Sequence, residues 1–256
     1  MALYSYPYPS YNWAYQGVDY AGIANLSQQL ANDMYADGIR FVGRYLYQAK
    51  YPNGKGITAQ EAQYYLNAGI KIFLYYEVDT TDALGGYARG VQNGQACLVE
   101  ANALSVPNGT QIYCCCDTTV TEQQAQGVVM DYLRGFAEQL PNYNVGIYGG
   151  TWVTLACYNE SPSYYRCQAG AWGNEEFSPI DVRQWLIAYN RQAMNDGRIN
   201  IQNITIDSNG YAAWRGNPVD LCSAPDLENM WGDDTPTPPT PTGDTKMPIW
   251  MYLKLF

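Results

Sequence analysis

Acidic side chains stand at the ends of several short apolar segments of this chain. Asp19 ends the segment GVD, Glu77 ends IFLYYE, Asp117 ends IYCCCD and Asp207 ends ITID. Asp and Glu are unfavourable strand residues, so four such endings call for a common reason. Two carboxyl groups that flank one bond, one as proton donor and one as nucleophile or base, are the means by which glycosidases cleave sugar polymers. These four acids are therefore the candidate catalytic residues.

The chain contains no histidine, which narrows the chemistry available to it. Ser-His and Cys-His nucleophile pairs are excluded, and the commonest zinc ligand is missing. The seven cysteines include three consecutive ones at 114–116, whose side chains alternate along a strand and cannot converge on one metal. No C-x-x-C pair occurs, so small buried side chains are the favoured interpretation, and a cysteine-dependent enzyme is disfavoured without an imidazole to activate the thiol. We expect neither a metal nor a cofactor.

The composition indicates a folded protein that does not bind nucleic acid. Hydrophobic residues make up 47% and charged residues 15% of the 256 residues, and the net charge is −10 with no basic cluster. Binding to phosphates needs grouped Lys and Arg, so nucleic acid is not an expected partner. The start MALYSY has neither a basic region nor an apolar stretch, and we expect no secretory signal. No run approaches the roughly 18 apolar residues of a membrane span.

Composition shifts divide the chain into four parts. Residues 1–15 form a Tyr- and Pro-rich N-terminal arm, and residues 16–232 form the main domain. Residues 233–246 are a Pro/Thr linker that favours extended geometry, and residues 247–256 are a short apolar tail. The tail could pack on a partner chain, lie at a membrane surface or belong to a cloning flank. We therefore expect that the arm or the tail could dock on a protein partner or on a membrane surface.

The main domain alternates short apolar strands with amphipathic stretches, the pattern of a parallel sheet. One predicted helix starts at the capping sequence Thr58–Glu61 and stops at Gly69, and another follows Asn25 and ends at Gly38. Later connections lack helical patterns. We therefore predict an α/β fold, a TIM-like (β/α) barrel with some short or missing outer helices. Its eight predicted strands are 16–20, 39–46, 70–78, 111–117, 143–148, 164–172, 180–186 and 203–208.

In such a barrel the C-terminal strand ends open on one face, where active sites are built. Glu77 and Asp117 would end neighbouring strands, and Asp19 would meet Asp207 where the first and eighth strands close the barrel. Crowded like charges raise at least one pKa and supply a protonated acid near neutral pH. Any one of these acids could instead cap a helix, bind solvent or pair with an arginine on the second strand, such as Arg44.

Aromatic residues near the same strand ends favour a sugar as the ligand. The chain has 25 Tyr and seven Trp, and flat rings beside carboxylates suit the C–H faces of sugars. Most of the tyrosines are expected to be ordinary amphipathic residues of the core and surface. The candidate substrate-binding residues are Arg44, Tyr45, Tyr148, Trp172 and Gln184.

The order of these motifs resembles a bacterial and phage family of glycoside-hydrolase-like domains, domain of unknown function 1906. The matching pieces include GVD at 17–19, FVGRYL at 41–46, LYYE at 74–77 and VGIYGG at 145–150, and the resemblance extends from about residue 16 to 212. That family is similar in fold to the barrel muramidases of glycoside hydrolase family 25. The resemblance implies that Asp19, Glu77, Asp117 and Asp207 line an acidic cleft.

One motif departs from the muramidase pattern. Those enzymes carry Asp-x-Glu on the fourth strand, whereas this chain reads Asp117-Thr118-Thr119. We therefore expect Glu77 to be the general acid and Asp117 to stabilise the oxocarbenium-like transition state, with Asp19 and Asp207 holding hydroxyls.

The expected function is that of a lysin-like glycoside hydrolase from a phage or Gram-positive bacterium. Its substrate would be peptidoglycan or a related amino-sugar polymer, reached outside the cell, at the wall or from a virion, after lysis or by a non-classical route. The alternative is a non-catalytic carbohydrate-binding or structural component of a virion or cell envelope, which the missing Glu on the fourth strand favours.

Overall fold

The computed structural model describes residues 13–23, 25–47, 55–173 and 178–232. The expected linker and tail, and all but the last residues of the expected N-terminal arm, lie outside these ranges. Within them, no helix combines the length and the apolar character that a bilayer crossing requires.

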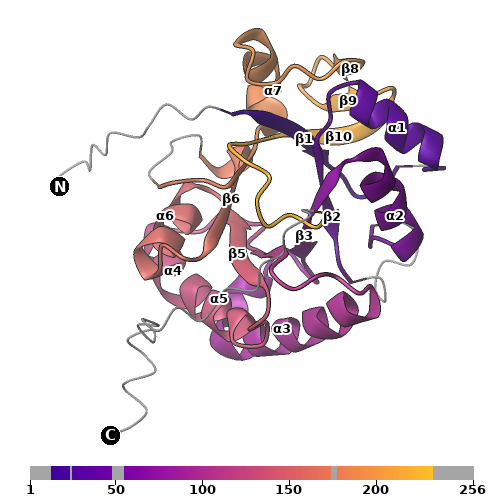
Figure 1. Cartoon of the computed structure of the whole chain (residues 1–256). Helices are drawn as coiled ribbons and strands as arrows, with labels where there is room; N and C mark the ends of the chain where they lie inside the picture. Colours follow the sequence, from indigo (N-terminus) through magenta and orange to yellow (C-terminus); the bar gives the residue numbers. More distant parts are fainter. Residues whose placement is uncertain (1–12, 24, 48–54, 174–177, 233–256) are drawn as a thin grey trace, which may run out of the picture.

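In the described part of the chain, seven parallel strands and one antiparallel strand close into a barrel (Figure 1). The closed barrel surrounded by helices confirms the predicted TIM-like α/β fold. Following the order of pairing, its strands are β1 (Tyr15–Asp19), β2 (Phe41–Tyr45), β3 (Lys71–Tyr76), β4 (Gln111–Cys115), β5 (Asn144–Gly149), β6 (Tyr165–Ala169), β7 (Val182–Gln184) and β10 (Asn217–Ala224).

The closing strand is not the one predicted from the sequence. Strand β8 (Ile204–Ile206) was expected to close the barrel, but it pairs only with β9 (Ala212–Trp214), which pairs with β10. A barrel strand needs both faces buried, whereas β8 is only half-buried and its central residue is exposed. Strand β10 ends in the fully buried run LCSA and pairs antiparallel with both β1 and β7. The prediction that 203–208 forms the eighth barrel strand is therefore wrong.

Helices cover the outside of the barrel unevenly (Figure 1). The connection from β6 to β7 has, in its described residues, only a 3-10 turn at Gly170–Trp172, which confirms the expected thinning of the outer layer. A π-helical turn at Ala125–Val129 separates the short α4 from α5. The α-helices are α1 (Gln28–Ala36), α2 (Ala59–Ala68), α3 (Gly86–Ala103), α4 (Glu122–Gln124), α5 (Met130–Ala137), α6 (Thr151–Glu160) and α7 (Leu186–Asn195).

The ends of α2 follow the sequence signals. The Thr58 side chain accepts a hydrogen bond from the Glu61 backbone N–H, and Gly69 ends the helix in the left-handed region at φ 82°. The Glu61 carboxylate pairs with Arg44 of β2, so it ties α2 to the barrel. The N-cap of α1 is Ser27, two residues later than the predicted start.

The barrel interior is filled with aromatic side chains. The ring centroid of Phe73 lies 6.0 Å from that of Phe41 and 4.9 Å from that of Tyr75. Two glycines make room for these rings, because a Cβ on Gly17 would come within 2.5 Å of the Phe41 ring and one on Gly43 within 2.4 Å of the Phe73 ring. The barrel is thus a packed core, and ligands can be bound only at its ends.

The segment after β10 closes the N-terminal end of the barrel. It crosses that opening as the yellow trace in Figure 1. Ile72 and Trp231 exchange two backbone hydrogen bonds, at 3.0 and 2.7 Å, and Gln111 donates its backbone N–H to the Asn229 carbonyl at 2.7 Å. Met230 is buried in the interior core. The opposite end, at the C-terminal tips of the parallel strands, remains as the mouth.

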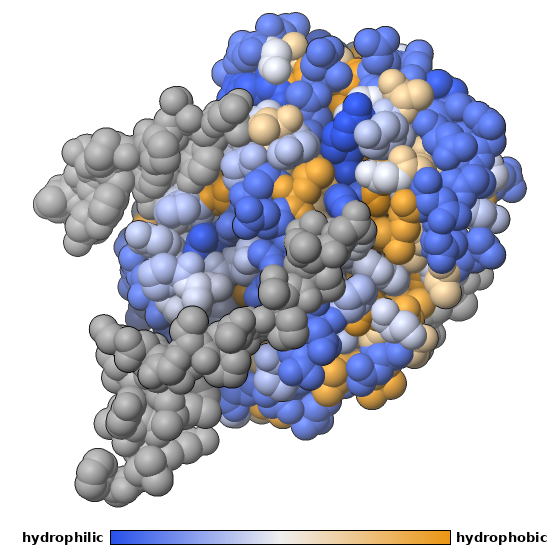
Figure 2. All heavy atoms as spheres, viewed as in Figure 1, coloured by the Kyte–Doolittle hydropathy of each residue, from blue (hydrophilic) through white to orange (hydrophobic). Residues whose placement is uncertain are grey.

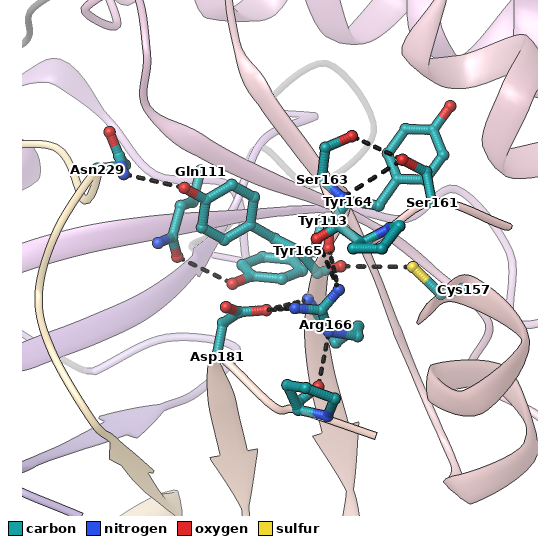
Figure 3. Close-up of polar contacts among 12 residues, drawn as sticks. Gln111, Tyr113, Cys157, Ser161, Ser163, Tyr164, Tyr165, Arg166, Asp181 and Asn229 are labelled. Carbon is teal, nitrogen blue, oxygen red and sulfur yellow. Dashed lines mark hydrogen bonds and ion pairs between the residues drawn. The ribbon is translucent and has the colours of Figure 1, made fainter. Parts of the chain in front are cut away.

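A polar network reinforces the closed end (Figure 3). Arg166 at the start of β6 donates to the carbonyls of Pro179 and Tyr164 at 2.6 and 2.5 Å, and its guanidinium lies 3.3 Å from Asp181. Burial raises the pKa of Asp181 to about 6, against the opposing effect of Arg166. The side chains of Asn229 and Tyr165 are joined by a 2.9 Å hydrogen bond. These contacts are structural, since they tie loops to strand starts.

The outer surface agrees with a layered core. In Figure 2, hydrophilic side chains dominate the outer edge of the molecule, and most apolar residues in view lie nearer the barrel. Residues buried between the strands and the helices form a second apolar core outside the barrel.

Candidate functional site

Three of the four predicted acids come to the mouth of the barrel. Asp19 ends β1, Glu77 follows β3 directly, and Asp117 comes two residues after β4. Asp207 is not among them, because β8 lies outside the barrel. Its exposed carboxylate accepts backbone N–H groups at 2.8 and 3.0 Å within its own turn. The expectation that Asp207 faces Asp19 is therefore wrong.

Asp220 of β10 takes the place expected of Asp207. It is the register partner of Asp19 across the antiparallel β1–β10 pair, so both side chains project from the same face. That face is the barrel interior, because the next pair in this direction, Gly17 and Cys222, lies against or within the interior core. Sequence reasoning missed Asp220, although it stands just before the apolar run LCSA and so carried the signal of a strand-borne acid.

Asp19 is a deeply buried acid with three hydrogen-bond donors around one oxygen. Its side chain is 2% exposed, and its Oδ2 accepts from Gln184 at 2.7 Å, Cys222 at 3.1 Å and Tyr75 at 3.5 Å. Burial, and then the charge of Asp220, raises the pKa of Asp19 to about 8, although these hydrogen bonds act in the opposite direction. Asp19 is thus mainly uncharged at neutral pH.

Gln184 contacts Asp19, Tyr148 contacts Gln184, and Trp172 packs against Tyr148. The Tyr148 hydroxyl donates to Gln184 Oε1 at 2.8 Å, so the amide bridges the phenol and the carboxyl group. The edge-on rings of Tyr148 and Trp172 have centroids 6.2 Å apart. Tyr148 is 7% exposed, whereas Trp172 is only half-buried. Of these two rings, Trp172 has the larger surface to offer a ligand.

Glu77 is held in an ion pair that the sequence did not reveal. Lys55 Nζ lies 2.8 Å from Glu77 Oε2 and 4.3 Å from the centroid of the Tyr45 ring. Glu77 is 5% exposed, and the Lys55 side chain is 26% exposed. Tyr45 therefore lies at the mouth, as expected, where its ring supports the lysine.

Asp117 completes the mouth as a half-buried carboxyl group next to Glu77. Burial, and then the negative charge of Glu77, raises the pKa of Asp117 to about 6, while Lys55 lowers it. Asp220 has a pKa of about 6 as well, because of burial and the charge of Asp117. The mouth thus contains carboxyl groups that change protonation near neutral pH, which is the property required of an acid–base pair.

Arg44 does not reach this mouth. It is fully buried between β2 and α2, where Nε lies 2.6 Å from Glu61 Oε1. Its guanidinium also donates to the Tyr20 carbonyl at 2.5 Å. This agrees with the structural alternative for Arg44, except that its acidic partner is Glu61 and not a strand-end acid.

In the part of the chain that the structure describes, neither a metal site nor a reactive thiol is found beside these acids. Within the described ranges, no cluster of three or more His, Cys, Asp or Glu side chains could hold a metal ion. All seven cysteines are buried, and burial raises the pKa of Cys115, beside Glu77 and Asp117, well above its usual value. Thiolate chemistry is therefore disfavoured.

Comparison with known proteins identifies the family. The model of the Rv2525c-like, glycoside hydrolase-like domain matches residues 32–213. This chain belongs to that family. The resemblance drawn from the strand-end motifs is thereby confirmed. The search among curated protein sequences finds no match.

Solved structures share the fold at low sequence identity. The Tat-secreted protein Rv2525c of Mycobacterium tuberculosis, in complex with HEPES, has a TM-score of 0.62 at 20% identity, over 85% of this chain and 98% of that one. An uncharacterised protein of B. stearothermophilus has a TM-score of 0.54 at 18% identity, over 85% of this chain and all of that one. These likenesses establish the fold and leave the activity to be argued from the mouth.

Proposed function

We propose that this domain is a glycoside hydrolase that cleaves peptidoglycan or a related amino-sugar polymer at the mouth of the barrel. The observation that carries the proposal is the contrast between two neighbouring carboxyl groups, Asp117 with a pKa of about 6 and Glu77 in an ion pair with Lys55. Two neighbouring carboxyl groups in unlike surroundings form the acid–base arrangement of a glycosidase.

The ion pair favours an exchange of the roles expected from the sequence. Lys55 holds Glu77 as the anionic partner, and a raised pKa leaves part of Asp117 protonated near neutral pH. Asp117 would therefore protonate the leaving oxygen, and Glu77 would act as the nucleophile or as the base that activates water. This assignment also removes the need for the Glu that muramidases carry two residues further on, where this chain has Thr119.

The other residues of the mouth would bind and orient the sugar. Asp220 and the neutral Asp19 can accept or donate hydrogen bonds to hydroxyls, and the half-buried Trp172 offers a ring for stacking. The Gln184–Tyr148 bridge would fix Asp19 in place. The family's glycoside-hydrolase-like character agrees with this reading. A wall substrate would be met outside the cell, after lysis or from a virion.

The test is zymography on bacterial cell walls with the wild type, Glu77→Gln and Asp117→Asn. We expect clearing by the wild type and a loss of at least about 100-fold in each variant, since each removes one partner of the acid–base pair. Asp207→Asn is the matched control, because this exposed acid lies outside the barrel, and it should clear normally. Equal clearing by all four proteins would refute the assignment.

The second candidate is a carbohydrate-binding barrel without catalysis. Two observations favour it, namely Thr119 in place of the muramidase Glu and the direct contact of Lys55 with Glu77. Titration with soluble peptidoglycan fragments, followed by chromatography of the same sample, separates the two. Binding without product formation selects the second candidate.

A further inference from the structure

We infer that Lys55 is a positioning residue, whose ammonium group binds the Glu77 carboxylate directly and so favours Asp117 as the proton carrier of the Glu77–Asp117 pair. The inference rests on the proposed function, because it assigns the partner that separates the two roles. It is carried by the backbone contacts of residues 56–58, by the ion pair between Lys55 and Glu77, and by the charges around that pair.

The backbone holds Lys55 at the mouth. The next residue, Gly56, forms a parallel β-bridge with Tyr45 at the end of β2, and the Ile57 N–H donates to the Tyr45 carbonyl at 2.8 Å. Ile57 is fully buried, and Thr58 caps α2. Residues 56–58 thus join the end of β2 to the start of α2, and they hold Lys55 at the mouth.

The Lys55 side chain is held from two sides. Its Nζ lies 2.8 Å from Glu77 Oε2 and 4.3 Å from the centroid of the Tyr45 ring, within the range of a cation–π contact. Because Glu77 is 5% exposed, loss of the ammonium would leave a poorly hydrated carboxylate, which gains by taking up a proton. Lys55 removes that tendency.

The surrounding charges give Lys55 its effect on the proton. The groups around the pair that can carry a negative charge are Asp220 on β10, Asp19 on β1 and the thiol of Cys115 at the end of β4, and Asp117 itself comes just after β4. All of these groups carry a negative charge when ionised, and Lys55 is a cation of the described residues that acts on Asp117. Lys55 lowers the pKa of Asp117 from a distance, but it contacts Glu77 directly at 2.8 Å, so it favours the form of the pair in which Glu77 is the anion.

The experiment follows the side-chain carboxyl carbons of Glu77 and Asp117 by NMR over pH 4–9, in full-length protein labelled at Asp and Glu. Variants are Lys55→Met, Lys55→Arg and the remote control Arg134→Gln, which removes a positive charge from α5 on the outer surface. We expect Lys55→Met to give the Glu77 signal a protonation step near that of Asp117, and to move the proton uptake of the pair up by about one pKa unit, or about tenfold in proton affinity. Lys55→Arg and the control should follow the wild type.

An unchanged Glu77 signal in Lys55→Met overturns the inference, as does an equal change in Arg134→Gln. Lys55→Gln replaces Lys55→Met if the latter does not fold. The readout needs no substrate, so it stands even if the wall assays show no hydrolysis. If the wall assays do show hydrolysis, the alkaline limb of the pH–rate profile of Lys55→Met should shift to higher pH, as the NMR titration does. General damage to the fold would instead lower the rate at every pH.

Discussion

The behaviour of Asp19 shows how a single residue depends on its surroundings. A buried carboxylate with three hydrogen-bond donors would normally be stabilised as the anion. Here burial and the nearby Asp220 outweigh those donors, and the pKa of Asp19 rises to about 8. The group is therefore best described as a neutral acid, whose position is fixed by Gln184 and Cys222.

Asp19→Asn should reduce the loss of stability that occurs as the pH rises from about 4 to about 8. The pKa of Asp19 in the folded state lies above its ordinary value of 3.8, so the stabilising contribution of Asp19 is complete at low pH and is lost as the pH rises from about 4 toward 8. Asn imitates the neutral acid at every pH. Urea midpoints measured from pH 5 to 9 should fall less steeply in the variant than in the wild type.

The control for this variant is Asp207→Asn, since an exposed turn position accepts Asn and should reproduce the wild-type slope. If the Asp19→Asn curve runs parallel to the wild-type curve, Asp19 is already ionised in the folded protein at neutral pH.

At the scale of elements, helices α3 and α5 pack unusually closely. A Cβ on Gly90 of α3 would lie 2.1 Å from the Tyr132 carbonyl oxygen, and one on Gly135 of α5 would lie 2.3 Å from the Tyr87 carbonyl oxygen. These glycines pack against the partner helix backbone, so α5 can follow α3 at close distance. Their conformation is ordinary helix, and their role is to leave space.

Gly90→Ala should destabilise the fold by about 1–3 kcal/mol, because the added methyl group meets rigid backbone and forces the helices apart. Gly127→Ala is the matched control in a helical turn, where an added Cβ has no atom within 4 Å. Replacing that glycine should be neutral or stabilising by about 0.4–1 kcal/mol. Urea unfolding of both variants measures the difference, and equal free energies of unfolding would argue against the close contact.

For the whole molecule, four carboxyl groups make folding depend on pH in one direction. The pKa of Asp19 is about 8, and those of Asp117, Asp181 and Asp220 are each about 6. All four pKa values exceed the ordinary Asp value of 3.8, so these groups bind more protons in the folded than in the unfolded chain between about pH 4 and pH 8. Asp37, whose pKa is lowered by hydrogen bonds from Arg215 and other donors, acts in the opposite sense.

The melting temperature should therefore fall as the pH rises from 5 to 8, by at least about 3 °C for a domain of this size. Calorimetry in low and high salt separates this effect from the self-repulsion of a chain with net charge −10. Salt screens repulsion between exposed charges but has little effect on buried acids, so the slope should persist at 1 M salt. A slope that disappears in salt would assign the effect to net charge.

The sequence by itself determined the class of fold and much of the chemistry. The alternation of apolar segments along the chain predicted seven of the eight barrel strands, because a strand buried on both faces has a recognisable local run of apolar residues. Thr58 and Gly69 bounded α2 through contacts within a few residues. Because the chain has no histidine, carboxyl groups were the expected acid–base groups. The positions of Asp19, Glu77 and Asp117 at strand ends predicted that these three acids share one end of the barrel.

Only the tertiary structure decided which strand closes the barrel, and with it the exchange of Asp207 for Asp220. Only in the folded structure does Arg44 pair with Glu61 of α2 and Lys55 with Glu77. Each of these outcomes depends on pairing between segments far apart in the chain. Short apolar segments have similar local patterns whether they pair inside a barrel or outside it, so the choice belongs to the packing of the whole domain.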